Sequence, residues 1–224
     1  MLYHCAAPFR NRFTTADLEF IASVIAPDEQ RMHLEKLWSD PIALREMLDH
    51  KEVFRAVLNS PATLRISARF YFHVLVRHAF LQAGLADAAL ADHVSGVMAK
   101  RLCPSADDPL ENISGGFTRA SDFISIIDQA HGRMRFHLQV AAGNQFLMLT
   151  GLYPEFLNHR SETTGGPSLE YYENFARQAY RGAADNREGA GPQTRKIFGT
   201  LAEVLPTARL SLNRMAEELV FLGT

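Results

Sequence analysis

Hydrophobic residues recur along most of this chain at the spacing of α-helices. Leu18, Ile21 and Ile25 fall on one side of a helix near the start of the chain, and Leu212 and Met215 do so near its end. No segment alternates apolar and polar residues as a half-buried strand does. We therefore predict an all-α fold, a compact orthogonal bundle of about ten helices with two long central helices and no sheet.

Local signals mark helix starts and a seam. Thr14 followed by Asp17 has the spacing of a capping box, while Asp40-Pro41 and Ser60-Pro61 each pair an N-cap residue with a proline. The turn formers of CPSADDPLENISGGFT, residues 103–118, predict an internal seam. Because the apolar helices on either side need one another's cover, we expect residues 1–224 to form a single all-α domain.

The stretch FYFHVLVRHAF belongs to a helix with unusual polar groups. Arg65, Arg69, His73 and Arg77 recur at steps of four and form one stripe, and His78 lies on a second stripe. Apolar side chains interrupt both stripes, whereas a surface helix has one continuous polar face. We therefore predict that this helix is central and that its polar groups have partners inside the fold.

The predicted central helix covers residues 61–83. Its lack of a polar face implies that Phe70, Val74 and Leu81 are all buried. The second central helix is predicted over residues 120–149, as the longest element of the chain.

This second helix also carries polar groups on two sides. Asp128, His131 and Arg135 follow one another at steps of three and four and form one stripe, and Asn144 lies on the other side beside Gly143. A glycine inside a helix is disfavoured by about 1 kcal/mol and usually permits the close approach of another helix, or a bend. We expect one of these two effects at Gly132 and at Gly143, which both stand inside this helix.

If the stripes of the two central helices face each other, they enclose a polar cavity. Arginine makes bidentate contacts to carboxylates and phosphates, so such a cavity suits an anionic ligand. A structural network of Asp, Arg and His, or two solvated helix edges, accounts for the same pattern more simply. The candidate ligand-binding residues are Arg69, His73, Arg77, His78, Asp128, His131, Arg135 and Asn144.

The net charge of the chain limits the classes of molecule that we expect it to bind. The net charge of −2 and the pI of about 6.5 give no basic field for nucleic acid or for an anionic membrane. The 19 arginines far outnumber the 4 lysines, a bias that anion binding or a GC-rich genome explains. We expect a small anionic molecule or a protein as partner, with no nucleic acid and no membrane, and a homodimer is left open.

The cysteines and the apolar segments indicate where in the cell the protein is located. Cys5 and Cys103 belong to no paired metal or redox motif, and the first residues lack the apolar core of a secretory signal. The longest uncharged run contains Gln139 and Asn144, which suits a buried helix better than a membrane span. We expect a cytoplasmic, soluble protein.

Signatures of catalysis are weak. The chain has no nucleophile elbow, no metalloprotease helix and no phosphate-binding glycine loop. Asp128 and His131 have the spacing of one dimetal motif, but that architecture needs two such motifs and two further carboxylates, so no metal is predicted and the cofactor is unknown. The sequence favours a helical binding or regulatory protein. The alternative is a metal-dependent or acid–base enzyme that uses His73, His78, Asp128 and His131.

Overall fold

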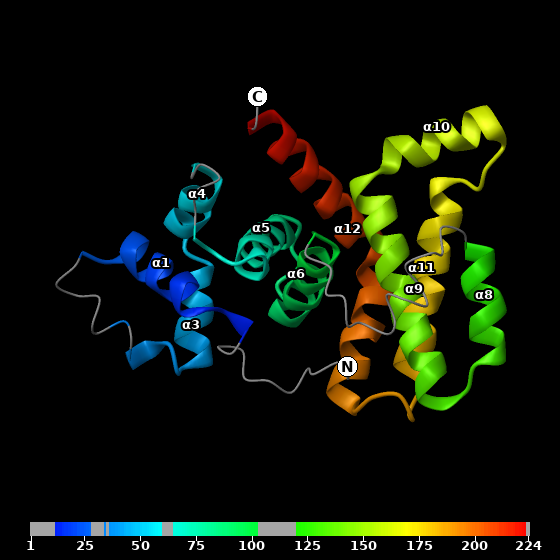
Figure 1. Ribbon diagram of the computed structural model, residues 1–224, viewed down its shortest axis with the longest axis horizontal. Helices are drawn as coiled ribbons and strands as arrows, with labels where there is room; N and C mark the ends of the chain where they lie inside the picture. The colour runs from blue at the N-terminus through cyan, green and yellow to red at the C-terminus, as the bar shows by residue number, and fades with distance from the viewer. Residues whose placement is uncertain (1–11, 28–33, 35, 60–64, 103–119, 223–224) are drawn as a thin grey trace. The chain divides into compact units, whose positions relative to one another are not determined.

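The computed structural model describes residues 12–27, 34, 36–59, 65–102 and 120–222, and these residues form helices and turns without a strand (Figure 1). The predicted all-α fold is confirmed. The helices that the described residues form are α1 Thr15–Ile25, α3 Pro41–Leu48, α4 Lys51–Asn59, α5 Ala68–Gln82, α6 Ala88–Leu102, α8 Ala120–Gln129, α9 Gly132–Leu152, α10 Pro154–Thr164, α11 Leu169–Asp185 and α12 Pro192–Leu222.

The chain divides into two compact units, an N-terminal unit of Leu2–Pro104 and a C-terminal unit of Ser105–Phe221. Their boundary lies inside the segment 103–118, where the sequence predicts a seam. The single domain over residues 1–224 stays a prediction. Across the part of the chain that the structure describes, every helix is too short or too polar to cross a bilayer.

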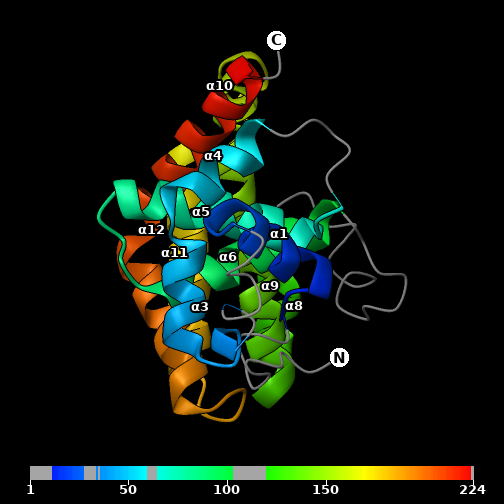
Figure 2. The same ribbon diagram turned by 90° about the vertical axis from the view of Figure 1, so that its left-hand side faces the viewer.

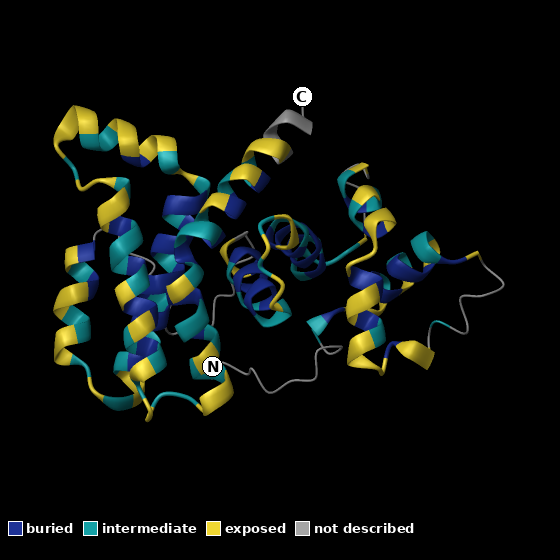
Figure 3. Cartoon of the chain, turned by 180° about the vertical axis from the view of Figure 1, so that it is seen from behind, coloured by how far each residue is buried: buried dark blue, intermediate teal, exposed yellow. Residues whose placement is uncertain are grey.

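In the N-terminal unit, α5 packs along α6, and α1, α3 and α4 pack against one another (Figure 2). The helix α5 is buried around most of its circumference, as the dark blue ribbon shows (Figure 3). Phe70 and Val74 are buried as predicted, but Leu81 is 39% exposed, so that prediction is wrong. Leu81 lies in the last turn of α5 on a side that is not covered, whereas Phe80 in the same turn is fully buried.

The observed start of α5 differs from the predicted one. Ser67 is the N-cap residue and its hydroxyl accepts a hydrogen bond from the backbone nitrogen of Phe70, so the helix begins at Ala68. Arg65 therefore precedes the helix and is not part of its stripe. The predicted start at Ser60-Pro61 falls outside the described residues.

In the C-terminal unit, α9 packs extensively along α11, and α8 and α10 pack against α9. The predicted continuous helix over residues 120–149 is wrong, because the chain breaks between α8 and α9 at Ala130 and His131. Gly132 follows with a φ of 55°, a left-handed conformation that glycine adopts without steric cost. The longest helix is α12, with 31 residues.

Two predicted helix starts are confirmed. Thr14 and Asp17 form a capping box at α1, in which each side chain bonds the backbone nitrogen of the other residue. At α3, the side chain of Asp40 accepts a hydrogen bond from the backbone nitrogen of Ile42, and Pro41 occupies the first turn. Such caps satisfy backbone donors that the helix itself leaves without a partner.

Candidate functional site

The predicted stripe of α5 is engaged by acidic residues of its own unit. Nη2 of Arg69 donates hydrogen bonds to Oδ1 of Asp92 at 2.6 Å and to the backbone oxygen of Asp92 at 2.7 Å. Arg12 forms a second ion pair with the same carboxylate. Asp92 is only 7% exposed, so two guanidinium groups neutralise a carboxylate that has little access to water.

Arg77 makes the most complete set of contacts in the stripe. Its Nε and Nη2 donate to the two carboxylate oxygens of Asp49 at 2.9 and 2.8 Å, in a bidentate arrangement. Its Nη1 donates to the backbone oxygen of Ala86 at 2.7 Å. Arg77 therefore joins α5 to the C-cap of α3 and to the segment before α6.

His73 lies between these ion pairs and is 1% exposed. Its ring contacts the ring of Phe13 edge-on, with centroids 5.3 Å apart. Burial first, and then the positive charges of Arg69, Arg77, Arg12 and Arg45, together lower the pKa of His73 from 6.5 to about 3. The imidazole is therefore neutral at neutral pH and has no additional proton to donate.

His78 lies apart from the ion pairs. Its ring stacks on the ring of Phe54, with centroids 3.5 Å apart and an interplanar angle of 15°. Its Nε2 lies 2.9 Å from Nε2 of Gln82, one turn further along α5. These contacts hold the ring against α4 and the exposed end of α5.

The candidate residues of the C-terminal unit are spread along two helices. Asp128 and His131 are exposed at the junction of α8 and α9, and Arg135 is half-buried in the first turn of α9. Asn144 is buried further along α9, where its Oδ1 accepts a hydrogen bond of 2.8 Å from the hydroxyl of Tyr180 on α11. Asn144 thus has a structural partner within its unit.

The predicted close approach at Gly143 is confirmed. A Cβ atom added to Gly143 would lie 2.6 Å from Cδ1 of Tyr180, nearer than real carbon atoms come. Because Gly143 has no side chain, the ring of Tyr180 packs directly against α9 at this position, and its hydroxyl reaches Asn144.

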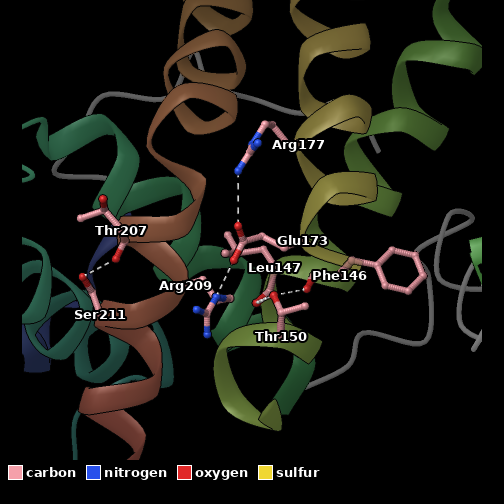
Figure 4. A network of polar contacts seen from close by, with 8 residues as sticks. All are labelled: Phe146, Leu147, Thr150, Glu173, Arg177, Thr207, Arg209 and Ser211. Carbon is pink, nitrogen blue, oxygen red and sulfur yellow. Dashed lines mark hydrogen bonds and ion pairs between the residues drawn. The ribbon is translucent and has the colours of Figure 1, made fainter. Parts of the chain in front are cut away.

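A second polar network ties α11 to α12 (Figure 4). One carboxylate oxygen of Glu173 accepts a hydrogen bond from Nε of Arg209 at 2.7 Å, and the other lies 3.3 Å from Nη2 of Arg177. The contact with Arg177 joins two successive turns of α11, and the contact with Arg209 joins α11 to α12, so the network is structural. None of its members is among the residues that the sequence singles out.

In the N-terminal unit, the fully buried side chain of Asp17 links α1 to the start of α5. Besides capping α1, the Asp17 carboxylate accepts hydrogen bonds from the backbone nitrogen of Ser67 at 2.6 Å and from its hydroxyl at 2.8 Å. Ser67 is itself the N-cap of α5. One carboxylate therefore fixes the starts of two helices against each other.

Beside this joint lies a cavity of about 520 Å³. One wall is α1, and the other consists of Trp38 and the two residues before Ser67. Two alanines of α1 complete the lining, whose larger members are Glu19, Phe20, Ser23, Trp38, Arg65 and Ile66. A volume between about 300 and 1,000 Å³ is usual for small-molecule sites, so this cavity is large enough for one.

The two charged residues of the cavity differ from the arginines of α5. Neither Glu19 nor Arg65 has an ion-pair or side-chain hydrogen-bond partner among the described residues. Arg69 and Arg77, in contrast, are bound to Asp92 and Asp49. Of the predicted arginine series, Arg65 is therefore the member whose guanidinium is available to a ligand.

Sequence reasoning misses both acidic partners, Asp49 and Asp92. Asp92 carries a usable signal, because it stands in the apolar run ALADHVSGVM just as His73 stands in its own apolar helix. Asp49 carries none, because it lies in the two-residue link between α3 and α4, where a polar residue is ordinary. The cavity arises from tertiary packing and leaves no periodic pattern.

No family model, curated protein or solved structure matches the chain. Among the described residues, no three His, Cys, Asp or Glu side chains are grouped so that they could hold a metal ion.

Proposed function

We propose that this is a binding protein whose N-terminal unit holds a small molecule with an apolar body and a negatively charged group in the cavity beside α1. One observation carries the proposal: the 520 Å³ cavity combines apolar walls with a guanidinium, that of Arg65, which has no partner among the described residues. Ligand sites typically join a mostly apolar lining to a few polar groups that fix orientation.

Different residues of the lining would contact the apolar body and the charged group of the ligand. Phe20, Trp38 and Ile66 offer aromatic and aliphatic surface to the body of the ligand. Arg65 offers two parallel N–H donors, the geometry that carboxylate and phosphate groups accept best. The sequence-based placement of the site between the helices of residues 61–83 and 120–149 stays a prediction. The cavity has the stronger physical support, because Arg69 and Arg77 are already bound to carboxylates.

Trp38 makes the proposal measurable. It is the only tryptophan of the chain and lines the cavity, so its fluorescence reports on this site alone. We expect 3-phenylpropanoate or phenyl phosphate to change the Trp38 emission and to raise the melting temperature, because a ligand that binds only the folded state stabilises it. Inorganic phosphate, which lacks an apolar body, should do neither at the same concentration.

Matched variants locate the binding. Arg65→Gln should weaken binding of the anionic probes by up to about fivefold, since Arg65 is exposed and an ion pair at an exposed side chain contributes about 0.2–1 kcal/mol. Arg55→Gln removes an exposed arginine of the same unit that pairs with Glu52, and it should leave binding unchanged. Equal effects of the two variants, or no response of Trp38 to any probe, would rule out this site.

The acid–base alternative has less support. His73 is nearly inaccessible and its pKa of about 3 leaves it without a proton to donate at neutral pH. A protein partner, a homodimer and a cytoplasmic location stay predictions from the sequence.

A further inference from the structure

We propose that the ligand of this cavity is a zwitterion, an α-amino acid with a large apolar side chain or a short peptide of such residues. This inference rests on the proposed function and names the substrate class of the same cavity. Its basis is a second charged group in the lining, since Glu19 stands in the wall that α1 forms while Arg65 stands in the other.

The two charges do not neutralise each other. Glu19 and Arg65 line one cavity, yet no ion pair joins them, and neither has another partner among the described residues. Two pairs of opposite charges in the same unit do meet, Arg77 with Asp49 and Arg69 with Asp92, and their side chains are less exposed than those of Glu19 and Arg65. Both side chains of the cavity are exposed and therefore solvated in the free protein. A ligand that carries both charges would pair with both groups, whereas a simple anion would lie beside the like charge of Glu19.

Charge complementarity fixes the orientation of such a ligand. Its carboxylate lies at Arg65, where a bidentate contact is available, and its ammonium group lies at Glu19. Its apolar side chain then rests on Phe20, Trp38 and Ile66. Ser23 is less available as a donor, because its hydroxyl already donates a hydrogen bond of 2.7 Å to the backbone oxygen of Phe20.

The carboxylate of Asp17 preserves the separation of the two charged groups. Glu19 is two residues beyond Asp17 on α1, and Arg65 is two residues before Ser67. The hydrogen bonds between Asp17 and Ser67 therefore hold both walls in a fixed relation without using either charged group of the cavity. A preorganised gap of this kind discriminates ligands by the positions of their charges.

The test uses three compounds that share a phenyl ring. L-Phenylalanine carries both charges, 3-phenylpropanoate only the carboxylate, and 2-phenylethylamine only the ammonium group. We expect the full-length protein to bind phenylalanine up to about fivefold more tightly than either analogue, followed through Trp38 fluorescence, because each analogue loses one ion pair with an exposed side chain. Phenylalanyl-phenylalanine, whose charges stand further apart, distinguishes a peptide from a free amino acid.

Single substitutions assign each end of the ligand. Glu19→Gln should abolish the preference for phenylalanine over 3-phenylpropanoate, and Arg65→Gln should abolish the preference over 2-phenylethylamine. Glu46→Gln, an exposed glutamate on α3 of the same unit, should alter neither preference. The Trp38 signal and a cooperative melt of each variant establish that it is folded.

The outcomes separate this inference from the proposed function. Equal affinity for phenylalanine and 3-phenylpropanoate, unchanged by Glu19→Gln, would overturn the zwitterion while leaving an anion-binding cavity. Absence of any response of Trp38 to all four compounds and to the anionic probes would overturn both. A preference for phenylalanine that survives both substitutions would also overturn the inference, because the charged groups would then not recognise the ligand.

Discussion

The carboxylate of Asp17 accepts two hydrogen bonds from Ser67, a residue 50 positions further along the chain. The same carboxylate accepts a third from the backbone nitrogen of Thr14 at 2.7 Å. A charged group with no exposure is tolerated because these donors replace its water. The joint fixes the start of α1 to the start of α5, and the candidate cavity lies between them.

Replacing Asp17 should therefore destabilise the N-terminal unit strongly. Asp17→Ala leaves the backbone nitrogens of Thr14 and Ser67 without their acceptor, and each buried donor without a partner costs about 1–3 kcal/mol. We expect a loss of about 2–4 kcal/mol in the free energy of unfolding, measured by denaturant titration.

Asp40→Ala is the matched control for this change. Asp40 is also an aspartate at a helix start, but it is exposed and caps a single donor, the backbone nitrogen of Ile42. Its loss should cost about 1 kcal/mol, the usual value for an N-cap. If Asp17→Ala costs no more than Asp40→Ala, the bonds to Ser67 contribute nothing to stability.

His73 predicts a specific acid sensitivity. The unfolded imidazole has a pKa near 6.5, whereas burial and the neighbouring arginines lower the pKa of the folded one to about 3. Between these values the unfolded state binds a proton that the folded state does not, so the stability conferred above pH 6.5 is lost as the pH falls. The expected loss is about 1.4 kcal/mol per pH unit below 6.5.

Unfolding free energies measured from about pH 7.5 down to about pH 5 test this, before the carboxylates titrate. His73→Gln should flatten the acid slope, because it removes the group that the unfolded state protonates. His131→Gln removes an exposed imidazole instead and should keep the natural slope. If the unfolding free energy of the unsubstituted protein is constant over this pH range, His73 is not held neutral by its surroundings.

The sequence predicts local features of this fold well. The spacing of Arg69, His73 and Arg77 is a property of consecutive helical turns, so their common face follows from the sequence alone. The capping pair of Thr14 and Asp17 is equally local. These features depend on residues no more than a few positions apart, and their geometry is fixed once the helix forms.

Partners that depend on tertiary packing could not be predicted in the same way. Asp49 and Asp92 bind the stripe from 28 and 23 positions away, and no periodicity relates them to α5. At Gly132 the sequence leaves close packing and a bend both open, and the break with its left-handed φ is visible only in the structure. The cavity beside α1 depends on the Asp17–Ser67 joint, which is likewise non-local.

The pairing of Arg77 can be measured by a double-mutant cycle. Arg77→Met and Asp49→Asn each leave a partly buried polar group without its partner, so each should destabilise the fold. The double mutant should lose less than the sum, with a coupling of about 1–3 kcal/mol, because the two residues share a bidentate contact. Simple additivity would mean that this ion pair does not contribute.

The same cycle with Asp128→Asn tests the arrangement of stripes predicted from the sequence. If the stripe of α5 faces Asp128, Arg77→Met and Asp128→Asn should couple by about 0.5–3 kcal/mol. If the two changes add, the stripes do not meet, and Asp49 is the partner of Arg77 that matters for stability.

The packing of α9 on α11 gives the last prediction. Gly143→Ala places a methyl group where the ring of Tyr180 lies, 2.6 Å from Cδ1, so the ring or the helix must move. Overpacking of this kind costs about 1–3 kcal/mol, and displacement of Tyr180 also weakens its hydrogen bond to Asn144.

Gly199→Ala is the matched control. It adds the same methyl group inside α12, but its nearest neighbour there is Cβ of Ala184 at an ordinary 3.7 Å. With no clash, the higher helix propensity of alanine should stabilise that variant by up to about 1 kcal/mol. The two denaturation midpoints should therefore shift in opposite directions, and a shift of the same sign in both would mean that α9 and α11 are not in close contact at Gly143.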